Sequence, residues 1–164
     1  MSDSRRGPDH PLGDRITVTL HELVDALDAD ADIRLRTLFD VTLSQYLFLA
    51  VLADLDRPDI TEQARCLGVS KAAVSKRLPS FVAAGWVRTG TDPANARRVV
   101  LHLTDTGVHL VADAGRMLEA EFTAMAAHLT SVDLDALHRE LTTLLAAFRP
   151  QPALPDPALP EKDR

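Results

Sequence analysis

Residues 61–104 read TEQARCLGVSKAAVSKRLPSFVAAGWVRTGTDPANARRVVLHLT, and this stretch decides the fold. Thr61 can cap a short helix, and Gly68 supplies the left-handed turn that ends it. Ser70 can cap a second helix, which stops at Gly85. Two helices joined by a short turn that contains glycine are typical of a helix-turn-helix, whose second helix lies in the major groove of DNA.

The second helix is predicted to have one apolar side and one small, cationic side. The apolar residues recur at helical spacing and should form a buried stripe; they are Val74, Leu78, Phe81 and Val82. The opposite side carries Ala72, Ala73, Lys76, Pro79 and Ser80, with Lys71 and Arg77 at its flanks. Small residues allow close approach to base edges, and Lys or Arg can reach phosphates or guanine. The alternative interpretation is an ordinary solvated helix face.

Pro79 lies ten residues into this second helix. Its ring should clash with the carbonyl of Ser75 and remove one hydrogen bond of the helix, at a cost of about 3 kcal/mol. We therefore predict a kink between Ser75 and Pro79, which leaves the turn from Ser70 to Ser75 regular.

The segment after the second helix changes to a strand, a turn and a second strand. Residues 86–90 and 98–103 are rich in β-branched and aromatic side chains, and residues 92–97 supply Pro, Asp and Asn for a turn. A hairpin directly after such a helix is a wing. Arg97 and Arg98 are expected where its tip bends back.

Six motifs follow one another along the chain: Gln45-Tyr46, Leu67-Gly68-Val69-Ser70, Val74-Ser75-Lys76, Ala84-Gly85-Trp86-Val87, the Asp92–Arg97 turn, and Leu103-Thr104-Asp105-Thr106-Gly107. In this order and spacing they resemble the MarR family of winged helix-turn-helix transcriptional regulators, over roughly residues 16–148. The resemblance implies a homodimer that binds a pseudo-palindromic operator in double-stranded DNA as a ligand- or stress-responsive repressor. It also implies a pocket for a small-molecule effector between the first, second and fifth helices.

The wing departs from the family pattern at one position. The family usually has an Asp two residues before the wing Arg, whereas this chain has Asn95 before Arg97. An asparagine can accept a hydrogen bond but cannot form a salt bridge. A less rigid wing is therefore expected.

The candidate site residues follow from these assignments. The predicted DNA-binding residues are Ser70, Lys71, Ala72, Ala73, Ser75, Lys76, Arg77, Arg97 and Arg98. His21 and Tyr46 are polar candidates for the effector pocket, and the alternative is that each is an ordinary helix residue. Cys66, beside Arg65, is either an oxidant sensor or a small hydrophobic residue at a semi-buried position.

The predicted fold is mainly α with a small β-hairpin wing: a winged helix-turn-helix with N- and C-terminal dimerisation helices. The expected segments are a flexible arm at 1–13, a MarR-like domain at 14–149 with its core at about 42–104 and dimerisation helices at about 14–31 and 105–148, and a Pro-rich disordered tail at 150–164.

Helical spacing also predicts the flanking helices and the side chains that they bury. The first helix should end within the Asp-Ala repeat at residues 28–32, which is a poor helix interior. A capping box at Thr42 and Gln45 should start the next helix. Apolar residues follow helical spacing in the first helix at Ile16, Leu20, Leu23, Val24 and Leu27, and in the long helix after the wing at Val108, Val111, Leu118, Phe122, Met125 and Leu129. In the second helix we expect the core to be faced by Leu43, Leu47, Val51 and Leu55, with Tyr46 and Phe48 at the edges. The last helix should present a coiled-coil-like seam formed by Leu134, Leu137, Leu141, Leu144 and Phe148. The helix before the seam should run to about Leu129, and the last one should start at Ser131 or Asp133.

Charge is distributed unevenly in the chain of 164 residues. The net charge is −6, yet residues 61–104 have seven Lys or Arg and two acidic residues, a net charge of +5, which leaves −11 for the remainder. A basic segment on an acidic protein suits a polyanionic partner.

Several function classes are excluded by what the sequence does not contain. It has no apolar run of about 20 residues, one cysteine, no metal-binding spacing among its histidines, no phosphate-binding glycine loop and no catalytic constellation. We expect a cytoplasmic protein that is not an enzyme, has no cofactor or metal, and does not bind a membrane. The alternative function is a winged-helix module for protein association that has lost DNA binding.

Overall fold

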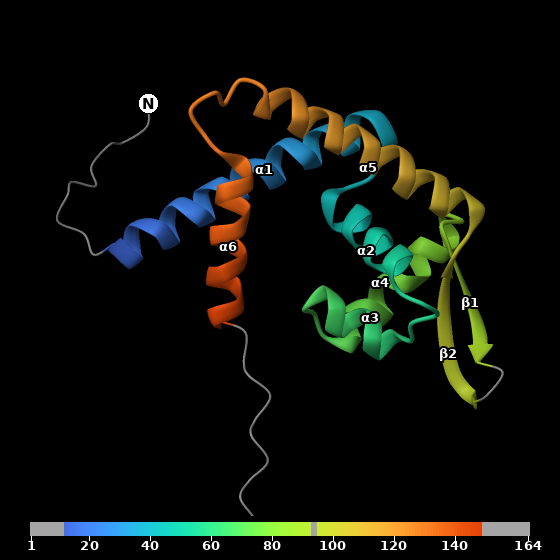
Figure 1. The fold of residues 1–164 in the computed structure, drawn as a ribbon. Helices are drawn as coiled ribbons and strands as arrows, with labels where there is room; N and C mark the ends of the chain where they lie inside the picture. Colours follow the sequence, from blue (N-terminus) through green and yellow to red (C-terminus); the bar gives the residue numbers. More distant parts are fainter. Residues whose placement is uncertain (1–11, 93–94, 149–164) are drawn as a thin grey trace, which may run out of the picture. The chain divides into compact units, whose positions relative to one another are not determined.

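The computed structural model describes residues 12–92 and 95–148, without the side chains of residues 12–14, 96 and 97. This described part contains six helices and two strands (Figure 1). Their bounds in chain order are α1 Leu12–Phe39, α2 Leu43–Asp54, α3 Ile60–Leu67, α4 Lys71–Ala83, β1 Val87–Asp92, β2 Asn95–Leu103, α5 Asp105–Ala126 and α6 Leu134–Phe148. The predicted fold class, helices with one hairpin wing, is confirmed. The arm before residue 12 and the Pro-rich tail at 150–164 lie outside the described residues.

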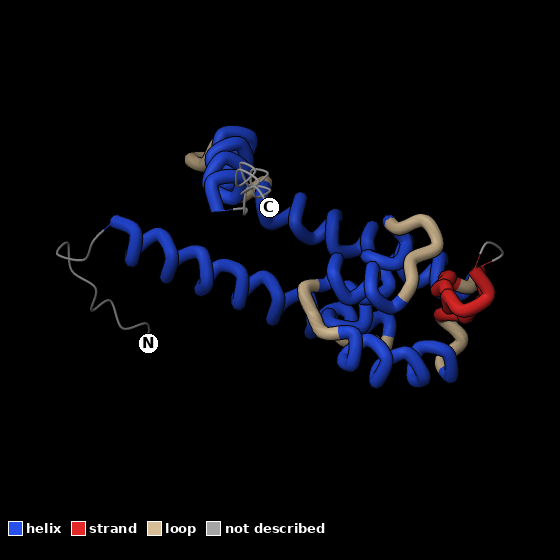
Figure 2. Tube along the Cα trace, turned by 90° about the horizontal axis from the view of Figure 1, so that it is seen from below, coloured by secondary structure: helices blue, strands red, loops and turns tan. Residues whose placement is uncertain are grey.

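The chain divides into two compact units, residues 1–121 and 122–164. The first unit holds the helices α1 to α4, the hairpin and most of α5. The second unit holds the last residues of α5 and all of α6. In the described residues the hairpin is the whole of the strand structure, and β1 and β2 lie side by side (Figure 2).

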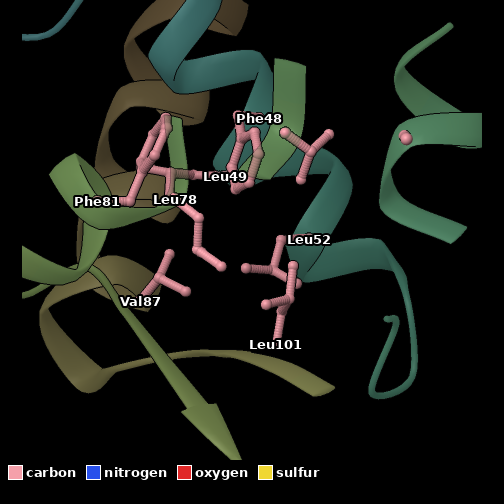
Figure 3. Close-up of a cluster of buried hydrophobic side chains, with 9 residues drawn as sticks. Phe48, Leu49, Leu52, Leu78, Phe81, Val87 and Leu101 are labelled. Atoms are coloured by element: carbon pink, nitrogen blue, oxygen red, sulfur yellow. The ribbon is translucent and has the colours of Figure 1, made fainter. Parts of the chain in front are cut away.

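A main core joins α2 to α3, α4 and the hairpin. Figure 3 shows side chains from these elements facing one another, and the buried members are Phe48, Leu49, Leu52, Ala64, Val74, Leu78, Phe81, Val87 and Leu101. The rings of Phe48 and Phe81 stack with 4.3 Å between their centroids. Such aromatic pairs contribute about 0.5–1.5 kcal/mol beyond the apolar area that they bury. This core fixes α4 against α2.

A second core joins α1 to α5. Its buried members are Leu35, Val41 and Ala114. Trp86 and Leu110 pack against both the main core and the second core. Trp86 therefore connects the winged helix-turn-helix to the long helices of the first unit.

Helix α1 is longer than the sequence predicted. It starts at Leu12 and continues through the Asp-Ala repeat to Phe39. Asp30 and Asp32 pair with Arg34 and Arg36 one turn later, at 2.7 and 2.5 Å, and such pairs stabilise a helix. Asp32 also accepts a hydrogen bond from the backbone N–H of Leu43 at 2.7 Å. Arg36 and this N–H hold the pKa of Asp32 below its usual value. The repeat is tolerated as a helix interior because the carboxylates of Asp30 and Asp32 have partners.

Helix α2 starts as predicted but buries a different face. Thr42 Oγ1 accepts from the N–H of Gln45 and Gln45 Oε1 accepts from the N–H of Thr42, so the capping box is confirmed. Of the expected inward residues, Leu47 is exposed and Leu43 packs against the second core, whereas Phe48, which was expected at an edge, is fully buried. Apolar residues occur on every side of α2, so their spacing does not select one face.

Helices α5 and α6 leave much of their apolar surface exposed. Helix α5 ends at Ala126, and its buried residues are Gly107 and Ala114, whereas four apolar residues in or just after it are exposed: Val108, Phe122, Met125 and Leu129. The carboxylate of Asp133 accepts from the N–H of Ala136 at 2.8 Å and so starts α6, one of the two predicted starts. No residue of α6 is buried, and 84% of Phe148 is exposed.

No single helix in the described part of the chain has the length and apolar character needed to cross a membrane. Residues 15–39 and 43–54 satisfy that test only as a pair, and the two helices are bent by 85°. The second of them contributes Phe48, Leu49 and Leu52 to the main core.

Candidate nucleic-acid interface

The helix-turn-helix is formed by α3 and α4. Asp59 caps α3 by accepting from the N–H of Glu62 at 2.9 Å, so the predicted cap at Thr61 was wrong by two residues. Gly68 ends α3 with φ of +66°, the left-handed conformation that favours glycine, as predicted. Gln63 is fully buried and donates from Nε2 to the carbonyl of Phe48 at 2.9 Å, which ties α3 to α2.

Helix α4 is held by its cap and its buried stripe. Ser70 Oγ accepts from the N–H of Ala73 at 3.2 Å, which confirms the predicted cap. Val74, Leu78 and Phe81 are buried, whereas Val82, the fourth predicted member of the stripe, is exposed. Helix α4 contacts β1, and Val82 lies outside the buried stripe.

Pro79 lies inside α4, which is assigned as one helix from Lys71 to Ala83. The predicted kink between Ser75 and Pro79 stays a prediction. Ser80 Oγ donates to the carbonyl of Arg77 at 2.6 Å, so this carbonyl has a side-chain partner in the turn next to Pro79.

The side of α4 opposite the stripe is exposed and basic. The exposed residues are Ser70, Lys71, Ala72, Ser75, Lys76 and Arg77, and Ala73 is half-buried. Helix α4 contains no acidic residue. Arg77 Nη1 donates to Ser44 Oγ at 2.9 Å, which holds the guanidinium near the start of α2. The structure thus brings the predicted α4 residues together on one surface, while their contact with DNA stays a prediction.

The hairpin extends further toward its tip than expected. Strand β1 runs to Asp92 and β2 starts at Asn95, with an irregularity in the register at Thr91 and Asp92. Asp59 forms an isolated bridge with Val100, and the N–H of Leu101 donates to the carbonyl of Pro58 at 2.9 Å. The base of the wing is therefore joined to the start of α3.

Arg98 does not lie free at the wing tip. Its Nε donates to Asp59 at 3.1 Å, its Nη1 donates to Asp92 at 2.9 Å, and Glu62 is 3.7 Å from Nη2. Its partners Asp92 and Asp59 raise the pKa of Arg98, and the N–H of Glu62 together with Arg98 lowers the pKa of Asp59. These partners position Arg98 in the structure, while its predicted contact with DNA stays a prediction. This cluster supplies a tether different from the Asp-to-Arg pair that Asn95 precludes.

The sequence analysis missed Asp59 and Asp92. An Asp three residues before Glu62 is a recognisable cap signal, and it was available in the sequence. The pairing with Arg98, in contrast, joins residues 39 positions apart. The side chain of Arg97, the other predicted wing residue, lies outside the described part.

The junction between the wing and α5 is closely packed. Thr104 Oγ1 donates to the carbonyl of Gly85 at 2.5 Å and accepts from the N–H of Gly107 at 3.1 Å. The N–H of Thr104 donates to the carbonyl of Trp86 at 3.0 Å. A Cβ atom on Gly107 would be 2.2 Å from that carbonyl oxygen. These bonds explain why the Gly85-Trp86 motif and the motif from Thr104 to Gly107 are both present in this chain, since the two segments contact each other.

The remaining candidates lie elsewhere. His21 is exposed on α1, where Nδ1 is 2.8 Å from the carbonyl of Thr17. Tyr46 packs against the second core, and burial raises the pKa of its phenol. Cys66 is exposed, so its expected semi-buried position was wrong. Within residues 12–92 and 95–148, no group of three or more His, Cys, Asp or Glu is arranged to hold a metal ion.

Comparison with known proteins finds similarity to one family over part of the chain. The sequence model of the MarR family matches residues 39–98, the segment that contains α2, α3, α4, β1 and the start of β2. Over these residues the chain is similar to proteins of the MarR family. No curated protein sequence matches the chain significantly.

Solved structures of MarR-family proteins share this fold over most of their length. Mutant MarR from E. coli is 25% identical, with a TM-score of 0.67 over 85% of this chain and 99% of that chain. FabT from Streptococcus pneumoniae, in complex with DNA, is 18% identical, with a TM-score of 0.72 over 82% and 95%. A MepR mutant from S. aureus, bound to oligodeoxyribonucleotide, is 20% identical, with a TM-score of 0.57 over 80% and 96%.

Proposed function

We propose that this protein is a transcriptional regulator that binds double-stranded DNA as a homodimer, with α4 of each subunit in the major groove. The observation that carries the proposal is the basic, acid-free outer side of α4, which carries Lys71, Lys76 and Arg77 and is held in place by a buried stripe. The DNA complexes of the FabT and MepR proteins support it by similarity of fold. Two such helices related by a twofold axis read half-sites centred about 10 bp apart.

Lys76→Ala tests the groove helix. Lys76 is exposed at the centre of the basic side, about one turn after the cap, so it should contact a base edge or a phosphate. Its loss should weaken binding to the cognate site by about 1–3 kcal/mol.

Arg97→Ala should weaken specific and non-specific duplexes more evenly, and it should reduce the salt slope by about one per subunit. Titrations of labelled duplex at several salt concentrations measure both effects.

Arg116→Ala is the matched control, because it removes one positive charge from an exposed position on α5. Its affinity should match that of the unchanged protein. Unchanged affinity in Lys76→Ala and Arg97→Ala would instead favour the protein-association module.

Homodimerisation is proposed to use the terminal helices. Four side chains of the α1 stripe are exposed, Ile16, Leu23, Val24 and Leu27, and so are four of α6, Leu137, Leu144, Leu145 and Phe148. Apolar side chains gathered along one helix in this way mark an interaction surface. A second copy of the chain would cover both surfaces.

The double change Leu137→Asp and Leu144→Asp should convert the dimer to a monomer. Charged side chains in a buried seam lose their hydration without gaining partners. Sedimentation should then give the mass of one chain, 17.9 kDa, instead of twice that mass. Thr143→Asp, at an exposed polar position of the same helix, should remain dimeric. A dimeric double variant would place the interface elsewhere.

The regulator is proposed to act as a repressor that responds to a ligand or to stress, and the support for this is the family resemblance. Selection of bound sites from genomic DNA, followed by transcription of the neighbouring genes with and without the protein, tests the sign of regulation. Transcription that rises when the protein is removed supports repression, and transcription that falls contradicts it.

A further inference from the structure

A cavity with a volume of about 510 Å³ lies where α2 ends, next to the base of the hairpin and the start of α5. Apolar side chains form most of its wall: Leu52, Leu55, Leu101, Leu103, Val108 and Val111. Cavities that bind small molecules in proteins are commonly about 300–1,000 Å³ and mostly apolar, with a few polar groups. All of these elements belong to the first unit.

Positive charge gathers on the polar side of this cavity. Arg57, Arg88 and His102 line it together with one carboxylate, Asp56. The same three basic residues also line a smaller adjoining cavity of about 290 Å³, so they lie between the two spaces. Within residues 12–92 and 95–148, the side chains of Arg57 and Arg88 form no ion pair and no hydrogen bond.

The pKa of His102 reflects the positive charge around the cavity. It pairs with Arg88 across the two strands, and its ring lies over Gly90, where an added Cβ would be 3.5 Å from Nε2. Burial lowers the pKa of His102, and the charges of Arg88 and Arg57 lower it further, while Asp56 opposes them. An anion placed between the two guanidinium groups would therefore neutralise unbalanced positive charge.

The backbone at Arg57 also points to a requirement for its side chain. Arg57 has φ of +49°, in the left-handed region. That conformation is unfavourable for most residues and less so for Gly or Asn. The side chain that this unusual backbone carries is one of those that line the cavity.

We propose that this cavity binds a small amphipathic anion, a carboxylate on an apolar body, with Arg57 and Arg88 holding the carboxylate and the leucine and valine side chains covering the body. The site is distinct from the effector pocket expected between the first, second and fifth helices, since its walls include both wing strands and no residue of α1. The proposal does not depend on DNA binding, so the two can fail separately.

Two probes of the same shape test the chemistry. Naphthalene-2-carboxylate and the neutral naphthalene-2-carboxamide are titrated into the full chain by calorimetry. A charge-assisted hydrogen bond contributes about 1.5–3 kcal/mol, so the carboxylate should bind at least tenfold more tightly than the amide. Equal affinities, or no binding of the carboxylate at millimolar concentration, would overturn the proposal.

Variants locate the site. Arg88→Gln and Arg57→Asn should each weaken carboxylate binding about tenfold or more, while Arg116→Gln on α5 should not. Arg57→Asn should keep or raise the melting temperature, because Asn tolerates the left-handed backbone. The ring signals of His102 in NMR spectra should shift on adding the carboxylate. Binding that is unaffected by both cavity variants, or that leaves His102 unshifted, would place the ligand elsewhere and contradict the assignment.

Discussion

Gln63→Glu should lower the free energy of unfolding by about 3–5 kcal/mol at pH 7, the penalty for a buried charge without a partner. Gln63 is fully buried, and its Nε2 donates to the carbonyl of Phe48. Its Oε1 has no hydrogen-bond partner among the described residues. A carboxylate at this position would face a carbonyl oxygen without a proton to share, inside the contact between α2 and α3.

The same variant should depend on pH in a defined direction. Burial raises the pKa of a carboxyl group in the folded state above the value of about 4.3 that it has in an unfolded chain. Below pH of about 4.3 the neutral acid can donate to Phe48, as the amide does, so the loss should be small. The loss should grow as the pH rises toward the folded pKa and reach its full size above it.

Urea unfolding at several pH values measures this loss, and Gln45→Glu is the matched control. Gln45 accepts from the N–H of Thr42 at the start of α2, where a glutamate makes the same bond and suits the helix dipole. The control should unfold like the unchanged protein. Equal losses in the two variants would show that Gln63 is not confined as the structure describes.

Gly107→Ala should lower the melting temperature by about 5–10 °C, which corresponds to about 2–3 kcal/mol for a chain of this size. The added Cβ would be 2.2 Å from the carbonyl oxygen of Trp86 and 3.1 Å from Leu103 Cδ2. That carbonyl is held by the N–H of Thr104, so the wing and α5 must move apart. Added volume in a closely packed site commonly costs about 1–3 kcal/mol.

Gly115→Ala in the same helix separates this clash from helix propensity. Alanine is better than glycine in a helix by about 1 kcal/mol, and this gain applies to both variants. The Cβ at residue 115 would be 3.2 Å from the hydroxyl of Tyr46, a side-chain atom that can shift. Thermal unfolding followed by circular dichroism should show little change for Gly115→Ala. A stability for Gly107→Ala as high as that of this control would contradict the close approach.

Local signals were the most reliable part of the sequence analysis. The capping box at Thr42, the cap at Ser70 and the left-handed Gly68 each depend on a few neighbouring residues, and the structure confirms all three. Helical spacing also placed Lys71 and Lys76 on the exposed side of α4.

The errors arose where distant residues decide local structure. The extension of α1 depends on Asp32, whose carboxylate binds the N–H of Leu43 after the chain has turned. The choice of Asp59 over Thr61 as a cap agrees with its pairing to Arg98.

The carboxylate of Asp59 limits movement between the helix-turn-helix and the wing. One oxygen caps α3 and the other binds Arg98 of β2, so a single side chain links the start of the helix-turn-helix to the wing. The base of the wing is also hydrogen-bonded to Pro58. In the proposed DNA complex, the distance between the groove helix α4 and the wing is then fixed within each subunit. Operators with a different half-site spacing would have to be accommodated by movement of the long helices, and not by separation of α4 from the wing.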